Sequence, residues 1–283
     1  MTEDLAEAPL RDDIAPEEDD SPEAVPVPAS LVPHLDQTAI LLDIDGTLLD
    51  LVPTPREVWV PPGLAKTLNR LLERTSGALA LVSGRSLNDI DLIFAPEQFP
   101  AVGGHGAEMR LSQDSEAVAT HAPPMDKELK RRLAAIAKLS PGILLEDKGY
   151  SLALHYRLAP HAEKAIYAAV SLIRADLPNA PIEVMPGKCV CEIKHSGFSK
   201  ASAVRELMTH EPFMGRRPLF VGDDVTDESV FAIMPDIGGL AFSVGRRAKG
   251  VAGHFDDPGD VRAWLAHLLD DEKSAMESWS NLT

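Results

Sequence analysis

The 283-residue chain is long enough for one or two domains with a buried core, and its 45% apolar and 25% charged residues are ordinary for a globular protein. Its formal net charge of −17 argues against binding to nucleic acid or to an anionic membrane surface. No apolar run reaches the roughly 18 residues of a transmembrane helix, and no basic segment precedes an apolar one near the N-terminus, so we expect a cytoplasmic protein without a signal peptide.

Acidic side chains and prolines dominate residues 1–36, where bulky apolar side chains are few. Such a segment buries too little apolar surface to offset the conformational entropy that it would lose on ordering. We therefore expect a disordered acidic tail, either simply solvated or used to dock a partner.

The first apolar run, residues 39–42, leads directly into Asp43 and Asp45 and is broken by Gly46 and Thr47. An unbroken run of this kind predicts a parallel strand buried on both faces, and ligands of such sheets bind beyond the carboxyl ends of the strands. Two carboxylates at one buried strand end repel each other unless a cation or a proton offsets them. An Asp-Gly turn that caps the next segment is the alternative interpretation.

A second strand of the same kind follows at residues 78–82, after a helix whose apolar face carries leucines at 64, 68, 71 and 72. It ends at Ser83, which is either the cap of the next helix or, by analogy with Asp43, a ligand for phosphate oxygens. His105 then lies among three glycines, which indicates a constrained backbone or close approach to a ligand.

The pattern changes over residues 112–193. A helix with apolar residues at 129, 133, 136 and 139 precedes two short strands, and a second helix precedes two more strands around a Pro186-Gly187 turn. This αββαββ order predicts an antiparallel sheet backed by two helices, inserted into the strand–helix alternation that resumes afterwards.

The resumed alternation places Lys200 at the start of a helix, where the helix dipole disfavours a cation unless an anion lies beside it. The apolar run 218–221 then ends in Gly222 and an acidic group, Asp223, Asp224 and Asp227. Helix capping explains one of these acids but not the cluster. Carboxylate oxygens around one point suit Mg²⁺, which would also bring a phosphate dianion to an otherwise repulsive site.

The stretch Asp43-Ile44-Asp45-Gly46-Thr47-Leu48 resembles the first motif of the haloacid-dehalogenase-like (HAD) phosphatases, and Ser83, Lys200 and Asp223–Asp227 match the other three motifs in order. The resemblance implies an α/β fold with a Rossmann-like HAD core, a mostly parallel sheet and an inserted α+β cap of the C2 type. It implies that Asp43 is the phosphoryl-accepting nucleophile and Asp45 the general acid and base. Ser83 and Lys200 would hold the phosphate oxygens, and Mg²⁺ would be held by Asp43, Asp45 and Asp223, with Asp224 and Asp227 behind them.

Within that superfamily, residues 37 to 270 resemble the trehalose-6-phosphate phosphatases. The resemblance rests on six stretches: 41–48, 83–86, 105–108, 155–157, 186–192 and 222–228. It implies Mg²⁺-dependent hydrolysis of trehalose 6-phosphate to trehalose and phosphate through an aspartyl-phosphate. The substrate, a phosphorylated disaccharide, would be bound by Gly84, Arg85, His105, Arg157, Lys188 and Glu192, of which Lys188 and Glu192 in the cap would bond the sugar hydroxyls.

One position departs from the family pattern, because Ala201 follows Lys200 where glycine is usual, and Lys194 is the alternative for that lysine. Two functional alternatives stay open: a HAD phosphatase for a sucrose, glucosylglycerol or mannosylglycerate ester, and a catalytically silent sugar-phosphate-binding module. A trehalose-phosphate synthase stays open as a partner.

The resulting domain prediction has five parts. We expect a tail at 1–36, a core built from 37–111 and 194–272, the cap at 112–193, and a C-terminal tail at 273–283.

Overall fold

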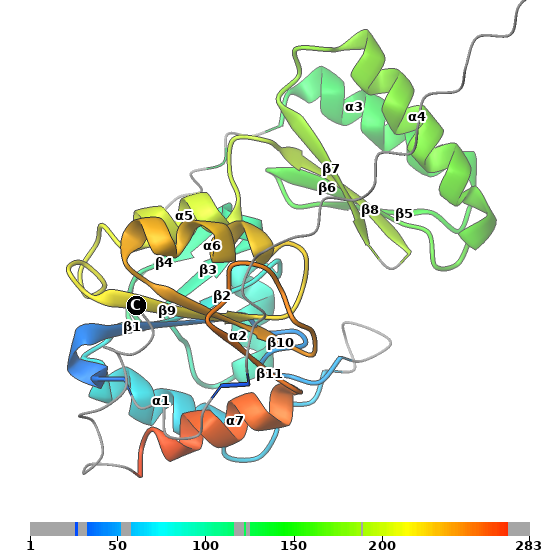
Figure 1. Ribbon diagram of the computed structural model, residues 1–283. Coiled ribbons are helices and arrows are strands. Elements are labelled where there is room, and N and C mark those ends of the chain that lie inside the picture. Colours follow the sequence, from blue (N-terminus) through cyan, green and yellow to red (C-terminus); the bar gives the residue numbers. More distant parts are fainter. Residues whose placement is uncertain are drawn as a thin grey trace, which may run out of the picture.

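The computed structural model describes residues 26–27, 33–51, 58–115, 122, 125–187 and 189–270. Figure 1 shows two α/β units of unequal size, a core and a smaller cap.

A seven-stranded sheet in the order β11-β10-β9-β1-β2-β3-β4 forms the core. Its strands are β1 (Thr38–Leu42), β2 (Leu79–Val82), β3 (Ala101–Gly103), β4 (Glu108–Arg110), β9 (Arg217–Gly222), β10 (Leu240–Val244) and β11 (Gly253–Phe255). Every neighbouring pair is parallel except β3 and β4, which are antiparallel. The predicted mostly parallel sheet is confirmed.

Helices cover both faces of this sheet, because successive side chains of a strand point to opposite sides. Ile40 and Leu42 of β1 pack toward α1 (Leu64–Arg74), α2 (Leu87–Phe94) and α7 (Pro258–His267). Ala39 and Leu41 pack toward α5 (Lys200–Leu207) and α6 (Glu228–Ile233) on the other face (Figure 1). Burial on both faces explains why the strands read as continuous apolar runs.

The cap has the predicted αββαββ order. Its elements are α3 (Lys127–Ile136), β5 (Leu144–Asp147), β6 (Ser151–His155), α4 (Glu163–Asp176), β7 (Ile182–Gly187) and β8 (Val190–His195). The four strands form an antiparallel sheet in the order β5-β6-β8-β7. The two helices cover the face of this sheet that lies away from the core (Figure 1), over an apolar core of their own.

Two local expectations in the cap are wrong. Helix α3 ends at Ile136, and Leu139 lies in a short 3₁₀ helix with its side chain 55% exposed, because the chain turns away from the sheet there. The second hairpin does not turn at Pro186-Gly187, since both residues are still paired with the next strand, Pro186 with Cys191 and Gly187 with Val190.

Parts of the expected tail contact the core. Val27 donates its N–H to the carbonyl of His254 in β11, and Leu35, in a 3₁₀ helix over Leu35–Gln37, is buried in the core. Apart from residues 26–27 and 33–36, the segment 1–36 lies outside the described part of the chain, as do residues 271–283.

Candidate active site

The predicted catalytic residues come together at the carboxyl edge of the core sheet. β1 lies between β2 and β9, and all three strands run parallel. Asp43 directly follows β1, Ser83 follows β2 and Asp223 follows β9. The amide of Asp43 continues the ladder to Val221, with an N···O distance of 2.9 Å. The strand ends therefore bring side chains from positions 43, 83 and 223 to one place.

A buried lysine joins two of the acids. Lys200 is the first residue of α5, behind a capping box formed by Ser199 and Ser202. Its Nζ donates to Oδ1 of Asp43 at 2.8 Å and to Oδ1 of Asp227 at 2.7 Å. Ala201 therefore does not disturb the placement of Lys200.

Burial and charge act in opposite directions on this group. Burial alone would lower the pKa of Lys200, but Asp43 and Asp227 raise it above its ordinary value, so the ammonium stays charged. Burial raises the pKa of Asp43 well above its ordinary value, although the charge of Lys200 opposes the shift. The site thus holds more negative charge than one ammonium can offset.

Asp223 supplies a further oxygen to the cluster. Ligand oxygens of Asp43, Asp223 and Asp227 lie within 4.8 Å of one another, and buried Oδ1 of Asp223 has no hydrogen-bond partner among the described residues. Burial, with the nearby charges of Asp227 and Asp224, raises the pKa of Asp223 to about 7. Gly46, at φ +80°, leaves the room that this carboxylate occupies, because a Cβ there would overlap it. A buried, unpaired carboxylate oxygen beside another carboxylate fits a hard divalent cation.

Asp227 and Asp224 shape the loop that carries Asp223. Oδ2 of Asp227 accepts the amides of Asp223 and Asp224 at 3.0 and 3.1 Å, so both of its oxygens are engaged. Oδ1 of Asp224 accepts the amide and hydroxyl of Thr226 at 2.7 and 2.6 Å. Both acids therefore fix local backbone, and Asp227 in addition lies inside the charged cluster.

Asp45 is placed differently from Asp43. Its carboxylate accepts two hydrogen bonds from Arg85, from Nε at 2.5 Å and from Nη2 at 2.6 Å. The amide of Arg85 in turn donates to Oγ of buried Ser83 at 3.2 Å. The side chain of Asp45, a predicted metal ligand, is thus paired with Arg85. The third acid beside Asp43 and Asp223 is Asp227.

His105 lies at the boundary between core and cap. It has φ +55° between Gly104 and Gly106, and a Cβ on Gly84 would overlap its ring, so Gly84 leaves the space that the ring occupies. Burial lowers the pKa of His105 to about 4, so the ring is neutral near pH 7. Its Nδ1 is buried without a partner among the described residues.

Glu192 of β8 lies on the cap side of this boundary. Its carboxylate accepts from Ser151 Oγ at 2.7 Å and from Lys148 Nζ at 3.3 Å. Burial would raise the pKa of Glu192, but the charge of Lys148 and the hydrogen bond from Ser151 outweigh burial and lower that pKa.

Three other predicted residues have different outcomes. Arg157 is exposed two residues beyond the end of β6, and Lys188 lies outside the described residues. Lys194, the alternative to Lys200, is buried at the end of β8, where it donates to the carbonyl of Phe198 at 2.6 Å and pairs with Glu183. It is not part of the acidic cluster.

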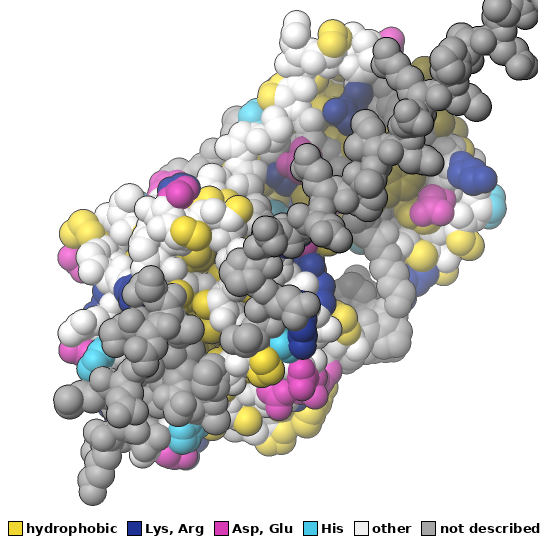
Figure 2. Space-filling view, in the orientation of Figure 1, with side chains coloured by type: hydrophobic (Ala, Val, Ile, Leu, Met, Phe, Trp, Pro, Cys, Tyr) yellow, Lys and Arg dark blue, Asp and Glu magenta, His cyan; other side chains and the backbone are white. Residues whose placement is uncertain are grey.

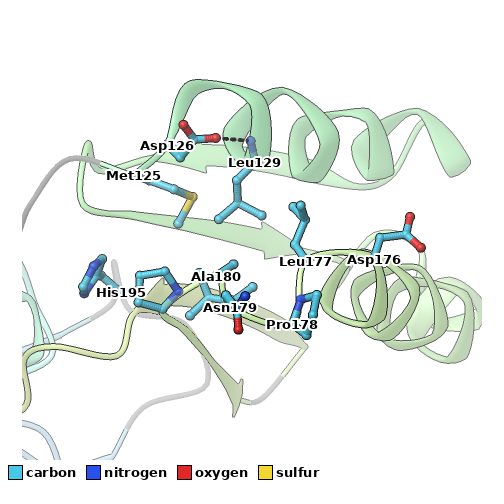
Figure 3. Close-up of a pocket in the computed structure, with 11 residues that line it drawn as sticks. Met125, Asp126, Leu129, Asp176, Leu177, Pro178, Asn179, Ala180 and His195 are labelled. Carbon is cyan, nitrogen blue, oxygen red and sulfur yellow. Dashed lines mark hydrogen bonds between the residues drawn. The ribbon is translucent and has the colours of Figure 1, made fainter.

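A cavity of about 640 Å³ lies at one end of the cap, between the start of α3 and the ends of α4 and β8 (Figure 3). Its lining is mainly apolar, and the Asp126 carboxylate at its rim is engaged by the amide of Leu129 at 2.9 Å. None of the predicted site residues lines it, so we assign it no part in the chemistry.

Sequence reasoning missed several partners of the site residues. The hydroxyl of Thr47 lies 3.4 Å from Oδ2 of Asp43, Lys148 and Ser151 hold Glu192, and Arg246 contacts the loop of Asp223. Of these partner residues, only Thr47 belongs to one of the motifs described above. Figure 2 also shows Lys and Arg side chains gathered on the core where it faces the cap, a favourable setting for a phosphate in an acidic protein.

Comparisons with known proteins give consistent matches. Residues 41–253 match the family model described as trehalose-phosphatase. The chain is 37% identical over 227 residues to the trehalose-6-phosphate phosphatase of Escherichia coli (strain K12), covering 80% of this chain and 85% of that protein. It is 42% identical over 219 residues to a probable trehalose-phosphate phosphatase of Sinorhizobium fredii, covering 77% and 81%.

Solved structures show the same fold. The C-terminal domain of the Candida albicans trehalose-6-phosphate phosphatase superimposes with a TM-score of 0.71 at 21% identity, covering 89% of this chain and 99% of that domain. No helix among the described residues has the length and apolar character needed to cross a bilayer. The family model, the identities and the HAD-type core with its cap lead to one conclusion: the chain is a member of the trehalose-phosphatase family.

Proposed function

We propose that this chain hydrolyses trehalose 6-phosphate to trehalose and phosphate, with Asp43 as the nucleophile. The observation that supports this most directly is the buried contact of Asp43 with Lys200 at the carboxyl edge of the sheet, beside the unpaired oxygen of Asp223. A pure binding module has no need of a carboxylate held in this way. The names of the relatives supply the substrate.

In the first step, an oxygen of Asp43 attacks phosphorus, and the bond from phosphorus to the sugar oxygen breaks. Lys200 holds Oδ1 of Asp43 at 2.8 Å. Among the described residues, Oδ2 has only the 3.4 Å contact with Thr47, so it is the freer oxygen for attack. Asp45 gives a proton to the departing sugar oxygen, which completes the aspartyl-phosphate on Asp43.

In the second step, water attacks the aspartyl-phosphate and Asp45 takes up its proton, which releases phosphate and restores Asp43. Arg85 orients Asp45 through its two hydrogen bonds, and the oxygen of Asp45 that carries the proton has to release one of them. We propose that Ser83, Gly84, Arg85 and Lys200 surround the equatorial phosphate oxygens, where negative charge spreads in the transition state.

We further propose that Asp43 and Asp223 hold Mg²⁺, with Asp224 and Asp227 fixing the loop behind them. When bound, the cation would offset the charge of the acids and of the phosphate dianion. Both oxygens of Asp45 are engaged by Arg85, so a role for Asp45 as a ligand requires that this pair opens.

On the cap side, Glu192 is proposed to accept hydrogen bonds from sugar hydroxyls, with His105 at the rim. Charged and neutral polar groups suit a hydroxylated disaccharide better than apolar surface does. Arg157 and Lys188 remain predicted contacts of the substrate. Cytoplasmic localisation and association with a synthase also remain predictions.

The test is phosphate release from a panel of sugar phosphates, with and without EDTA. The proposal expects trehalose 6-phosphate to have the highest kcat/KM, loss of activity in EDTA and recovery with Mg²⁺. If a sucrose, glucosylglycerol or mannosylglycerate ester is hydrolysed with the highest kcat/KM, the proposed reaction stands but the proposed substrate is wrong. If no ester is hydrolysed in the presence of Mg²⁺, the chain is a catalytically silent binding module and the proposal is wrong.

A further inference from the structure

Arg246 connects the loop after β10 to the loop that carries Asp223. Its guanidinium donates from Nε to the main-chain oxygen of Asp223 at 2.8 Å and from Nη2 to that of Asp224 at 2.9 Å. Nη1 donates to the carboxylate of Glu228, the first residue of α6, also at 2.8 Å. Ser243 fixes the other end by donating to the carbonyl of Arg246 at 2.8 Å. One side chain thus joins the end of β10, the acidic loop and the start of α6.

The acidic loop is therefore held from two sides. On the inner side, Oδ2 of Asp227 accepts the amides of Asp223 and Asp224 at 3.0 and 3.1 Å. On the outer side, Arg246 binds the carbonyls of the same two residues. With both its amide and its carbonyl fixed, the backbone of Asp223 has little freedom to turn, and the direction of its carboxylate is set.

Only arginine suits this arrangement. The planar guanidinium presents several N–H groups in a fixed fork, so it can bridge two successive carbonyls and a carboxylate at once. A lysine ammonium carries its three N–H donors on one nitrogen, so it cannot match three acceptors that are spaced along the guanidinium fork. The contact is thus specific in shape and not only in charge.

We propose that Arg246 is a positioning residue that sets the affinity of the site for a divalent cation, by fixing the main chain of Asp223; this rests on the proposed role of Asp223 as a ligand. Arg246 itself has its donors on protein acceptors and contacts neither Asp43 nor Lys200 in the described structure. Groups that orient metal ligands from behind typically change metal affinity by roughly 10- to 100-fold when removed.

The experiment measures the Kd for Mg²⁺ by isothermal titration calorimetry on the full chain, together with the concentration of Mg²⁺ that gives half-maximal activity. Arg246→Ala should weaken the Kd by roughly 10- to 100-fold, and excess Mg²⁺ should recover most of kcat. Arg246→Lys should restore the affinity only in part. The control is Arg205→Ala, which removes the same charge from an exposed pair with Asp236 and should bind Mg²⁺ like the wild type.

The outcomes separate this inference from the proposed function. If Asp223→Ala loses Mg²⁺ binding while Arg246→Ala keeps the wild-type Kd, the role of Arg246 is wrong and that of Asp223 stands. If the wild type and Asp223→Ala bind Mg²⁺ alike, Asp223 is not a ligand and both fail. Equal weakening in Arg205→Ala would show an effect of net charge and would also overturn the inference. If Arg246→Ala does not fold, the same comparison is made with Arg246→Gln, which keeps a single side-chain nitrogen as donor.

Discussion

Removal of the buried ammonium should destabilise the protein in a way that depends on pH. Lys200 is 3% exposed, and its Nζ lies 2.8 Å from Asp43 and 2.7 Å from Asp227, which are also buried. Lys200→Met keeps much of the side-chain volume but leaves two carboxylates together without a counter-charge. Loss of one partner from a buried ion pair costs about 3–5 kcal/mol, because the remaining charge is neither solvated nor paired.

That cost is large against the total free energy of unfolding. Single domains are stable by about 5–15 kcal/mol, and each kcal/mol shifts the melting temperature of a protein of this size by about 2–4 °C. We therefore expect the melting temperature of Lys200→Met to fall by roughly 6–20 °C near neutral pH.

The sign of the pH dependence follows from the carboxylates. Burial already raises the pKa of Asp43 and Asp227, and loss of Lys200 raises both further. The folded variant then takes up protons at a pH where the unfolded chain, with an ordinary pKa of about 3.9, does not. Its stability deficit relative to the wild type should therefore shrink as the pH falls from about 8 toward 5.

The assay is urea unfolding of both proteins at several pH values, with Lys194→Met as the matched control. Lys194 is equally buried, but its carboxylate partner Glu183 is 54% exposed and stays solvated when the lysine is lost. The control should lose about 1–3 kcal/mol, mainly from the bond to the carbonyl of Phe198, with little change over this pH range. A similar, pH-independent loss in both variants would refute the reasoning about Asp43 and Asp227.

Three further predictions concern single residues. His105 has a pKa of about 4 when folded against 6.5 when free, so the stability that its neutral form gives above about pH 6.5 should be lost toward pH 4. The reference is His105→Asn, because asparagine tolerates a positive φ. Between pH 6.5 and pH 4, the free energy of unfolding of the wild type, measured with urea, should fall relative to this variant by up to about 1.4 kcal/mol per pH unit. Parallel plots of unfolding free energy against pH for the two proteins would contradict this. Glu192→Gln should lower kcat/KM for trehalose 6-phosphate roughly 10- to 100-fold and leave p-nitrophenyl phosphate nearly unchanged; equal losses on both would assign Glu192 to the fold or to closure. Asp45→Asn should lower kcat by roughly 10²- to 10⁴-fold, the range for a lost general acid or base, and near-normal turnover would remove Asp45 from that role.

Much of the core could be predicted because burial on both faces leaves a direct signal in the sequence. The runs before Asp43, Ser83 and Asp223 are continuous and apolar, and all three end at one edge of the sheet, as parallel strands require. The four leucines of α1 likewise lie on one buried face. The positions of these catalytic candidates therefore follow from the pattern of the strands alone.

The pairing among the charged side chains could not be predicted in the same way. Asp45 meets Arg85 and Lys200 meets Asp227 through tertiary contacts between separate elements, and any of several acids could have filled either place. Arg246 lies in a loop with no motif, and only the fold brings it to Asp223. In the cap, short strands with mixed exposure leave the turn position open, and the strand pairing continues through the predicted turn at Pro186-Gly187.

The central claim is that the carboxylate of Asp43 attacks the phosphate of trehalose 6-phosphate. The most direct measurement is phosphate release from this ester in Mg²⁺ by the wild type and by Asp43→Asn, at matched concentrations of folded protein. An amide keeps the shape of the side chain but is a poor nucleophile, so turnover by Asp43→Asn should fall to the background rate. Retention of about a tenth of wild-type activity by Asp43→Asn would contradict the account.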